Sequence, residues 1–546
     1  MIKFFPLSLV VFSVLFVSCT SEKTSADLLV KNANVYTVDE AFSTAEAFVI
    51  TDGTIVEVGT SSELEAKYNA TDVMDAGGKT ILPGLIDAHA HLYNLGVSLQ
   101  NVDLVGTTSY QEVLDRVVAF QKEKNLNYIT GRGWDQNDWD VKEFPTKKEL
   151  DELFPDTPVA LTRIDGHAMI TNSKALEMAG ITPDTKMDGG EVIVQDGELT
   201  GILIDTPMRL VGATMPDLTT AQAATALKEA QDKCISLGLT TVNDAGLNRA
   251  VIELIDSLQQ AGAIDLRVYA MVSNSEDNLN YFLNKGIVKT DRLNVRSVKV
   301  YGDGALGSRG AAMRAPYSDQ PGHYGAMITT EEQLQALAER IAAAGYQMNT
   351  HAIGDSANVA VLRVYDKVLA DKPDRRWKVE HAQVVSLPDF DCFSKNIIPS
   401  VQSTHATSDM YWAEDRVGPH RIEGAYAYKS LLDQAGIVAL GTDFPVEKVN
   451  PMHTFYASVA RKDLENYPEG GYRIEEALTR EETLRGMTIW AAYSNFEENE
   501  KGSIEAGKVA DFVLLDQDVM TIPENDIPNV KVLATYINGE KVYSSE

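Results

Sequence analysis

Two histidines separated by one residue lie at the end of an apolar run, and this arrangement can bind a metal ion. His89 and His91 follow Ile81-Leu82-Pro83-Gly84-Leu85-Ile86 in the stretch Asp87-Ala88-His89-Ala90-His91. Side chains at i and i+2 of a β-strand project from the same face, because strand side chains alternate with period two. Neutral imidazole nitrogens are common ligands of zinc and other transition metals. The pair alone is equally compatible with two surface histidines after a core strand, so the rest of the chain must decide.

The elements that must position these histidines are eight short apolar segments, several of them separated by helical stretches. The predicted strands cover residues 81–87, 239–244, 266–272, 295–301, 347–351, 377–381, 397–402 and 437–442. Helical runs such as 221–236 and 331–344 lie between them, and this alternation is typical of a parallel sheet. Eight such units predict an α/β fold, a (β/α)8 TIM barrel, whose active site forms at the carboxyl ends of the strands.

One internal region is too long for a single crossover connection. Residues 96–237 contain a further predicted strand at 159–164 and a hairpin at 192–204. We therefore expect an insertion after the first barrel strand, inside a barrel domain that spans 81–499.

Both ends of the chain consist of short strands and hairpin turns. Asp52-Gly53 and Asn538-Gly539 are strong turn signals, because these residues tolerate positive φ angles. The simplest arrangement pairs residues 27–80 with residues 500–546 in one small β-sandwich beside the barrel.

Further residues of metal-binding type occur at the ends of other predicted strands. Lys299 lies in the fourth strand, His351 and His381 end the fifth and sixth, and Asp443 follows the eighth. The chain has nine histidines, and four of them fall at three of these ends. Because the carboxyl ends of barrel strands meet at one face, we expect these side chains to converge on a metal centre.

Composition and charge exclude some classes of function. The 546 residues carry a net charge of −31, whereas a nucleic-acid-binding protein needs a basic face. The acidic residues are spread along the chain, which is typical of a solvated surface. We therefore expect a small-molecule substrate and no nucleic-acid partner.

The first residues are typical of a targeting segment. Lys3 precedes an apolar stretch that is too short to span a membrane and that ends in Phe16-Val17-Ser18-Cys19. This pattern resembles a bacterial lipoprotein signal over residues 1–18, with a lipid on Cys19 and a tether over 19–26; ordinary secretion is the alternative. The resemblance implies a lipid-anchored protein of the bacterial cell envelope, on the periplasmic or outer-membrane face. The membrane leaflet and homo-oligomerisation stay open.

Longer motifs resemble the amidohydrolase superfamily of metal-dependent hydrolases, from about Asp27 to the C-terminus. The most specific are Leu82-Pro83-Gly84-Leu85-Ile86-Asp87-Ala88-His89-Ala90-His91 and Gly502-Ser503-Ile504-Glu505-Ala506-Gly507-Lys508. Three further motifs resemble the branch that includes YtcJ-like proteins and N-substituted formamide deformylase. They are Val298-Lys299-Val300-Tyr301-Gly302-Asp303-Gly304-Ala305-Leu306-Gly307-Ser308-Arg309, Gly131-Arg132-Gly133-Trp134-Asp135 and Arg163-Ile164-Asp165-Gly166-His167-Ala168. The resemblance implies the barrel with a β-sandwich that the strands also predict.

The resemblance also implies a set of metal ligands. His89 and His91 would bind the more buried metal ion, His351 and His381 a second one, and Lys299 would bridge the two as a carbamate. A lysine ammonium has no lone pair, but a desolvated neutral amine can add CO₂ and become a two-oxygen ligand. An unmodified lysine that holds a carboxylate or a substrate anion is the alternative. Two zinc ions are the expected cofactors, and Fe, Mn, Co or Ni would fit similar ligands.

Other residues would act on the substrate. Asp443 would carry protons and also touch a metal ion, with a helix N-cap as the alternative role. His167 would donate a hydrogen bond to the substrate or to an oxyanion. Trp134, Asp303 and Arg309 are further candidates for contact with the substrate, with simple packing as the alternative for Trp134.

The resulting hypothesis is a hydrolase of class EC 3.5 that cleaves N-acyl or N-formyl amides with a metal-activated hydroxide. Family analogy does not determine the substrate. A dipeptidase, a cyclic amidase, a deaminase or an isomerase would use the same centre. A lipoprotein that binds a small molecule without turnover is a further alternative, against which the complete ligand set argues.

Overall fold

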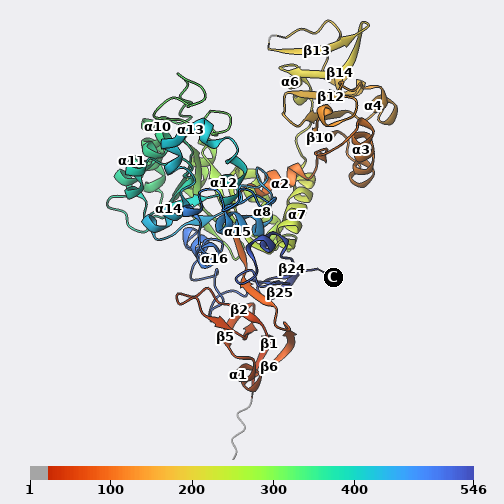
Figure 1. Ribbon diagram of the computed structural model, residues 1–546. Helices are drawn as coiled ribbons and strands as arrows, with labels where there is room; N and C mark the ends of the chain where they lie inside the picture. The colour runs from red at the N-terminus through yellow and green to blue at the C-terminus, as the bar shows by residue number, and fades with distance from the viewer. Residues whose placement is uncertain (1–22, 188, 546) are drawn as a thin grey trace, which may run out of the picture.

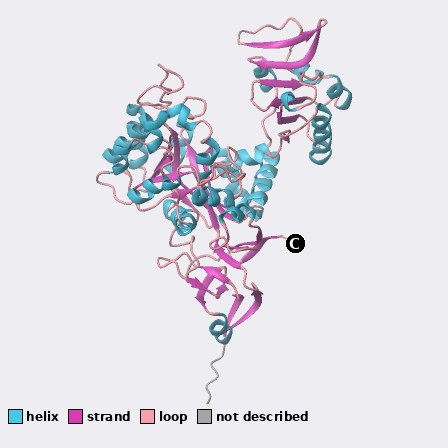
Figure 2. Cartoon of the chain, viewed as in Figure 1, coloured by secondary structure: helices cyan, strands magenta, loops and turns pink. Residues whose placement is uncertain are grey.

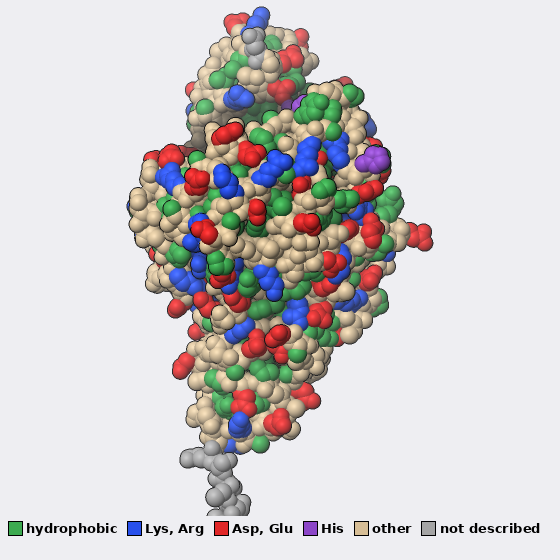
Figure 3. Space-filling view, turned by 90° about the vertical axis from the view of Figure 1, so that its left-hand side faces the viewer, with side chains coloured by type: hydrophobic (Ala, Val, Ile, Leu, Met, Phe, Trp, Pro, Cys, Tyr) green, Lys and Arg blue, Asp and Glu red, His purple; other side chains and the backbone are tan. Residues whose placement is uncertain are grey.

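The structure is a computed structural model that describes residues 23–187 and 189–545. Figure 1 shows a central body, a smaller region that stands apart from it beside α2 (Leu92–Ser98) and α7 (Thr220–Ser236), and strands from both chain ends below. The predicted signal segment 1–18 and Cys19 lie outside the described residues. Figure 3 shows acidic and basic side chains interspersed over one face of the molecule. Among the described residues, no helix combines the length and the apolar character needed to cross a membrane.

The central body is built on eight parallel strands, one for each predicted segment. In sheet order they are β8 (Leu85–Ala90), β15 (Leu239–Leu247), β16 (Arg267–Ser273), β18 (Leu293–Tyr301), β19 (Gln347–Ala352), β20 (Trp377–His381), β21 (Ile397–Val401) and β22 (Ala439–Leu440). All seven neighbouring pairs are parallel. β8, β20 and β21 are buried at every residue, and this is why such strands form continuous apolar runs in the sequence. The predicted barrel is confirmed.

The first and last strands of the barrel meet just beyond their ends. The Asp443 N–H donates to the His89 carbonyl, and the His91 N–H donates to the Phe444 carbonyl, both at 2.8 Å. Gly441 allows this approach, because a Cβ atom there would lie 2.5 Å from the His89 backbone nitrogen. The closure places residues from opposite ends of the barrel sequence side by side.

Helices surround these strands (Figure 2). They are α7, α8 (Arg249–Gln260), α9 (Glu276–Lys285), α10 (Glu331–Ala343), α11 (Asp355–Leu369), α12 (Ser403–Asp409), α13 (Ala413–Arg421), α14 (Tyr428–Ala435), α15 (Pro451–Ala460), α16 (Arg480–Gly486) and α17 (Ile489–Ser494). Each predicted helical run is present, as α7 and α10. In α7 a capping box at Thr219 starts the helix, and Ala223, Leu227, Ala230 and Cys234 line its buried face at helical spacing.

Strands from both ends of the chain form two sheets. One sheet contains β5 (Thr54–Gly59), β4 (Ala47–Thr51), β1 (Thr24–Lys31) and β6 (Tyr68–Asp75), with α1 (Ser61–Lys67) between β5 and β6 in the chain. The other contains β25 (Glu540–Ser544), β24 (Val532–Ile537), β23 (Phe512–Leu515), β7 (Thr80–Pro83), β2 (Asn34–Tyr36) and β3 (Thr44–Ala45). Phe48 and Phe512, one from each sheet, pack edge to face with ring centroids 5.1 Å apart. β1 pairs with β6 from Thr24 onward, so residues 24–26 belong to a sheet and not to the predicted tether.

The residues between α2 and α7 form a further sheet with apolar clusters of its own. Its order is β13 (Gly190–Gln195), β14 (Glu198–Asp205), β12 (Ala168–Thr171), β11 (Val159–Arg163), β10 (Ile129–Trp134) and β9 (Val102–Asp103). Its helices are α3 (Tyr110–Lys124), α4 (Lys148–Leu153), α5 (Ser173–Met178) and α6 (Met208–Gly212). β9, β10 and β11 are parallel, so the loops that follow them share one edge of the sheet.

Candidate metal centre

Side chains from the first, fourth and last barrel strands meet at the carboxyl ends of the strands. Lys299, in β18, places its Nζ 2.9 Å from His89 Nε2. Asp443 Oδ1 lies 3.2 Å from His91 Nε2 and 3.7 Å from His89 Nε2. His89 and Lys299 are buried, so these atoms form an enclosed cluster.

His351 and His381 complete this cluster from the ends of β19 and β20. The imidazole centroids of His351 and His381 are 4.5 Å apart, and those of His381 and His89 are 4.9 Å apart. Strand alternation would turn Glu380 and His381 to opposite faces, but a φ of +72° at His381 bends the strand end. Both side chains consequently reach His89. The structure thus brings together the six predicted ligands, called the ligand ring below: His89, His91, Lys299, His351, His381 and Asp443.

Three imidazoles of the ligand ring are held from outside through Nδ1. The pairs are His89 with Glu380 Oε2 at 2.5 Å, His381 with Gln402 Oε1 at 2.7 Å, and His91 with the Ala245 carbonyl at 3.0 Å. An acceptor at Nδ1 selects the tautomer that carries its proton there and leaves the Nε2 lone pair free. Metal-binding histidines are oriented in the same way by acceptors behind them.

The donor set fits a divalent metal ion. His89, His91 and Asp443 each offer a ligand atom, and these atoms lie within 4.8 Å of one another; so do those of His381, His405 and Asp443. In the described part of the chain, the buried Oδ1 of Asp443 has no hydrogen-bond partner. A buried carboxylate oxygen normally has a partner, and a cation would supply one here.

Burial shifts the ionisation of the cluster toward forms that can bind metal. Burial lowers the pKa of Lys299, which favours the neutral amine. Burial also lowers the pKa of His351 to about 3, which keeps its imidazole neutral. Burial alone would raise the pKa of Asp443, but the neighbouring imidazoles, first His405 and then His91, hold it well below its usual range.

His405 and Glu380 belong to the site and were missed in the sequence. His405 lies on α12, with Nε2 3.3 Å from Asp443 Oδ2 and Nδ1 3.2 Å from Glu447 Oε1. Burial lowers its pKa, but these two carboxylates outweigh burial and raise the pKa to about 10. The available signal was its position, three residues beyond the seventh predicted strand. Glu380 precedes His381 in the same strand. Strand alternation would turn the two side chains to opposite faces, so the sequence did not indicate that Glu380 also reaches the site.

Two predicted substrate-site residues lie in the insertion, away from the ligand ring. Trp134 is fully buried and donates its Nε1–H to the Leu161 carbonyl at 2.8 Å. It packs in the core of the insertion, and its contact with a substrate stays a prediction. His167 precedes β12, is 75% exposed, and places Nδ1 2.7 Å from Asp205 Oδ1. Figure 1 shows β10 and β12 apart from the barrel, so the structure does not bring His167 to the ring. Its catalytic role stays a prediction.

Asp303 and Arg309, just beyond Lys299, are occupied by protein partners. The carboxylate of Asp303 accepts hydrogen bonds from the N–H groups of Ala312 at 2.8 Å, Ile353 at 2.9 Å and Gly354 at 2.8 Å. Its side chain is completely buried and ties the loop after β18 to the end of β19, and its substrate contact stays a prediction. Arg309 forms two hydrogen bonds with Asp319, at 2.8 and 3.0 Å.

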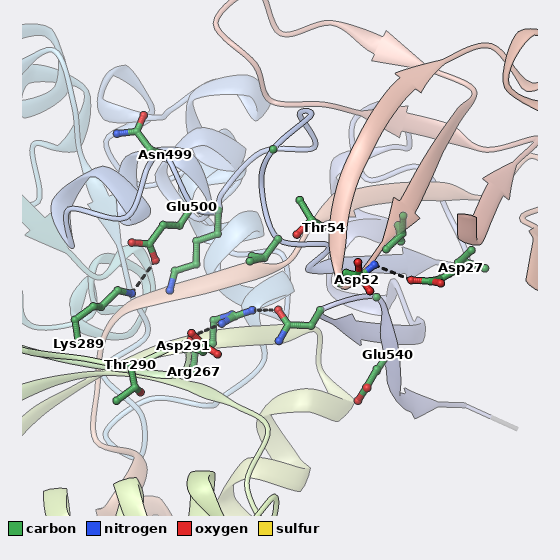
Figure 4. Close-up of a pocket in the computed structure, with 18 residues that line it drawn as sticks. Asp27, Asp52, Thr54, Arg267, Lys289, Thr290, Asp291, Asn499, Glu500 and Glu540 are labelled. Atoms are coloured by element: carbon green, nitrogen blue, oxygen red, sulfur yellow. Dashed lines mark hydrogen bonds and ion pairs between the residues drawn. The ribbon is translucent and has the colours of Figure 1, made fainter. Parts of the chain in front are cut away.

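A cleft of about 890 Å³ lies at the opposite, amino-terminal side of the barrel, against the sheets from the chain ends (Figure 4). Arg267, at the start of β16, pairs there with Asp511 at 2.6 Å. Lys289 pairs with Glu497 at 2.6 Å and Glu500 at 2.8 Å. These cations are already neutralised, and none of the described lining residues belongs to the ligand ring.

Comparisons with known proteins agree with this geometry. A model of the Amidohydrolase family matches residues 72–543. The chain is 30% identical over 522 residues to the protein YtcJ of Bacillus subtilis (strain 168), covering 93% of this chain and 98% of that protein. It is 27% identical over 544 residues to N-substituted formamide deformylase of Arthrobacter pascens, covering 94% and 97%. The crystal structure of an uncharacterized metal-dependent hydrolase from Pyrococcus furiosus matches with a TM-score of 0.75 and 27% identity, over 90% of this chain and all of that one.

Proposed function

Because this chain belongs to the amidohydrolase family, we propose that it hydrolyses C–N amide-type bonds, with N-acyl or N-formyl amides of small amines as substrates. The metal-dependent hydrolase with a similar structure supports metal-assisted hydrolysis. The deformylase relative supports an amide as the substrate.

One observation carries this proposal. Three imidazoles approach one enclosed space from the ends of two strands, β8 and β20, and each has its Nδ1 occupied by an acceptor outside that space. An isolated core histidine needs no such alignment, whereas a metal site requires several lone pairs directed at one point.

Asp443 would move the proton. A divalent metal ion in this site would polarise the substrate carbonyl and lower the pKa of water. The Asp443 carboxylate, held at the edge of the ring, would accept the proton of the attacking water and pass it to the leaving nitrogen. The low pKa of Asp443 keeps its carboxylate ionised, and the ionised form is the one with a lone pair for that proton.

Lys299 would bridge two metal ions as a carbamate. Its Nζ lies in the ring beside His89 Nε2, and burial favours the neutral amine that can react with CO₂. Two zinc ions are our proposal, and other divalent transition metals suit the same ligands. Intact-mass measurement on the native, metal-loaded protein would detect the added CO₂, and a bare amine would remove Lys299 from this role.

The first experiment is a metal analysis by plasma mass spectrometry, paired with a turnover screen of N-acyl and N-formyl amides. About two ions per chain, with release of acid and amine, would support the proposal. About one ion would favour a mononuclear centre without a bridging lysine. Release of ammonia would indicate a deaminase. Protein that stays metal-free and inactive after treatment with Zn²⁺ and bicarbonate would indicate a binding protein.

We also propose that a lipid on Cys19 holds the protein at the cell envelope. The apolar stretch before Cys19 supports this, and the first strand starts soon after it, at Thr24. Labelled palmitate should be incorporated by the parent chain and not by Cys19→Ser.

We further propose a division into two domains. The sheets of residues 27–80 and 500–546 form one domain, and the barrel with the insertion at 96–237 forms another.

A further inference from the structure

His405 lies against the ligand ring but has no role in the proposed function. It belongs to α12, after the seventh barrel strand, and its side chain is 13% exposed. Its Nε2 is 3.3 Å from Asp443 Oδ2, and its Nδ1 is 3.2 Å from Glu447 Oε1. The imidazole therefore forms a bridge between two carboxylates.

The partners of His405 distinguish it from the ligand histidines. Each ring nitrogen of His405 is already in contact with a carboxylate oxygen, although His405 lies within ligand distance of His381 and Asp443. His381, by contrast, pairs one nitrogen with Gln402 and leaves the other free.

The two oxygens of Asp443 have different surroundings. Oδ2 faces His405, whereas Oδ1 faces His91 and has no hydrogen-bond partner in the described part of the chain. Glu447, behind His405, also accepts a hydrogen bond from the Ser408 hydroxyl at 2.6 Å. His405 is thus held at its far side and can fix the rotation of the Asp443 carboxylate.

We infer that His405, backed by Glu447, is a positioning residue that orients Asp443 so that Oδ1 points into the ligand ring. This inference rests on the proposed function, in which Asp443 carries the proton. It assigns His405 neither to the metal nor to the substrate.

The test compares variants of the full chain loaded with Zn²⁺ in the presence of bicarbonate. His405→Ala should lower kcat about 100-fold, because misplacement of a reacting group by about 1 Å has an effect of that size. KM and the metal content should stay near the parent values, because the four histidines and Lys299 of the ligand ring are untouched. His405→Gln should have a kcat about tenfold higher than that of His405→Ala, since its amide nitrogen can still donate to Asp443.

Two further variants control this comparison. Glu447→Ala should lower kcat with unchanged metal content, because it releases the far side of His405. His453→Gln should behave as the parent, because His453 lies on nearby α15 and has no described hydrogen bond to Asp443. If His405→Ala does not fold, His405→Gln and Glu447→Ala carry the test.

Three results would overturn the inference. The first is metal loss in His405→Ala as large as in His381→Ala, which would make His405 a ligand. The second is no rate difference between the alanine and glutamine variants. The third is a crystal structure of the zinc-loaded His405→Ala protein in which Asp443 keeps its orientation. If the parent chain cleaves no amide, the proposed function is refuted. The crystal structure of the His405→Ala protein still tests whether His405 orients Asp443.

Discussion

Two sets of parallel strand ends in this chain carry histidine and carboxylate side chains, and they differ in what surrounds those side chains. In the barrel, the ends converge on buried imidazoles whose outer nitrogens are already bound. In the insertion, β10 and β11 lead into loops where Arg163 pairs with both Asp135 and Asp165. The same loops carry His167, which pairs with Asp205.

Enclosure decides what the two sets can do. His89 has no exposed surface, whereas the side chain of His167 is 75% exposed. A buried lone pair without a partner is satisfied only by a ligand, while an exposed one is satisfied by water. The His167–Asp205 pair is exposed, and exposed ion pairs contribute only roughly 0–1 kcal/mol to stability. A position at a strand end therefore identifies candidates, and burial separates a metal centre from a polar surface.

The largest expected effect comes from Asp443→Asn in the barrel. Turnover should fall about 1,000-fold or more, because the amide cannot accept the proton of the attacking water. Metal content should stay near the parent value, since the histidines remain. Both are measured on one preparation, by amide hydrolysis and by plasma mass spectrometry. Loss of metal with an unchanged circular dichroism spectrum would reassign Asp443 as mainly a ligand.

Glu380→Gln should act through His89. The carboxylate behind a metal-binding histidine orients it and raises its basicity, and removing that partner costs about 10–100-fold in metal affinity. Competition with a chelator measures this loss. Asp205→Asn is the matched control, because it removes the charge behind His167 in the insertion and should leave metal affinity unchanged. Equal metal affinities in the parent and Glu380→Gln would mean that the carboxylate behind His89 matters no more for metal binding than the one behind His167.

The barrel and the convergence of most residues of the ligand ring could be predicted, because buried strands have a recognisable sequence pattern. Strands covered on both faces read as apolar runs, and His89, His351, His381 and Asp443 each lie at or just after the end of such a run. Strand order then follows from the parallel topology, so convergence at one face needed no further information.

Contacts that depend on a bend or a loop could not be predicted in this way. Glu380 reaches His89 only because the φ of +72° at His381 breaks strand alternation. His405 reaches Asp443 from the first turns of α12, whose direction no periodicity specifies. Trp134 shows that an aromatic residue in a distinctive motif can equally belong to a core.

Trp134→Ala should separate the stabilities of the two regions. Removing a fully buried tryptophan typically costs about 3–5 kcal/mol, and the neighbours of Trp134 belong to the insertion's own apolar cluster. Hydrogen exchange should show faster opening of β10 and β11, while metal content stays at the parent value. Loss of metal together with the insertion would mean that the ligand ring depends on it for its stability.

The smallest effect is expected for His167→Asn. His167 is exposed and held by Asp205 at a distance from the ring, so kcat/KM should change by less than about threefold, under 1 kcal/mol. Asp205→Asn should give a similarly small change. A fall above about tenfold, with metal retained, would show that the insertion edge meets the barrel mouth during turnover. In that case the insertion would close over the barrel mouth during turnover and shield the site from water. His167 would then have the hydrogen-bonding role that its motif predicts.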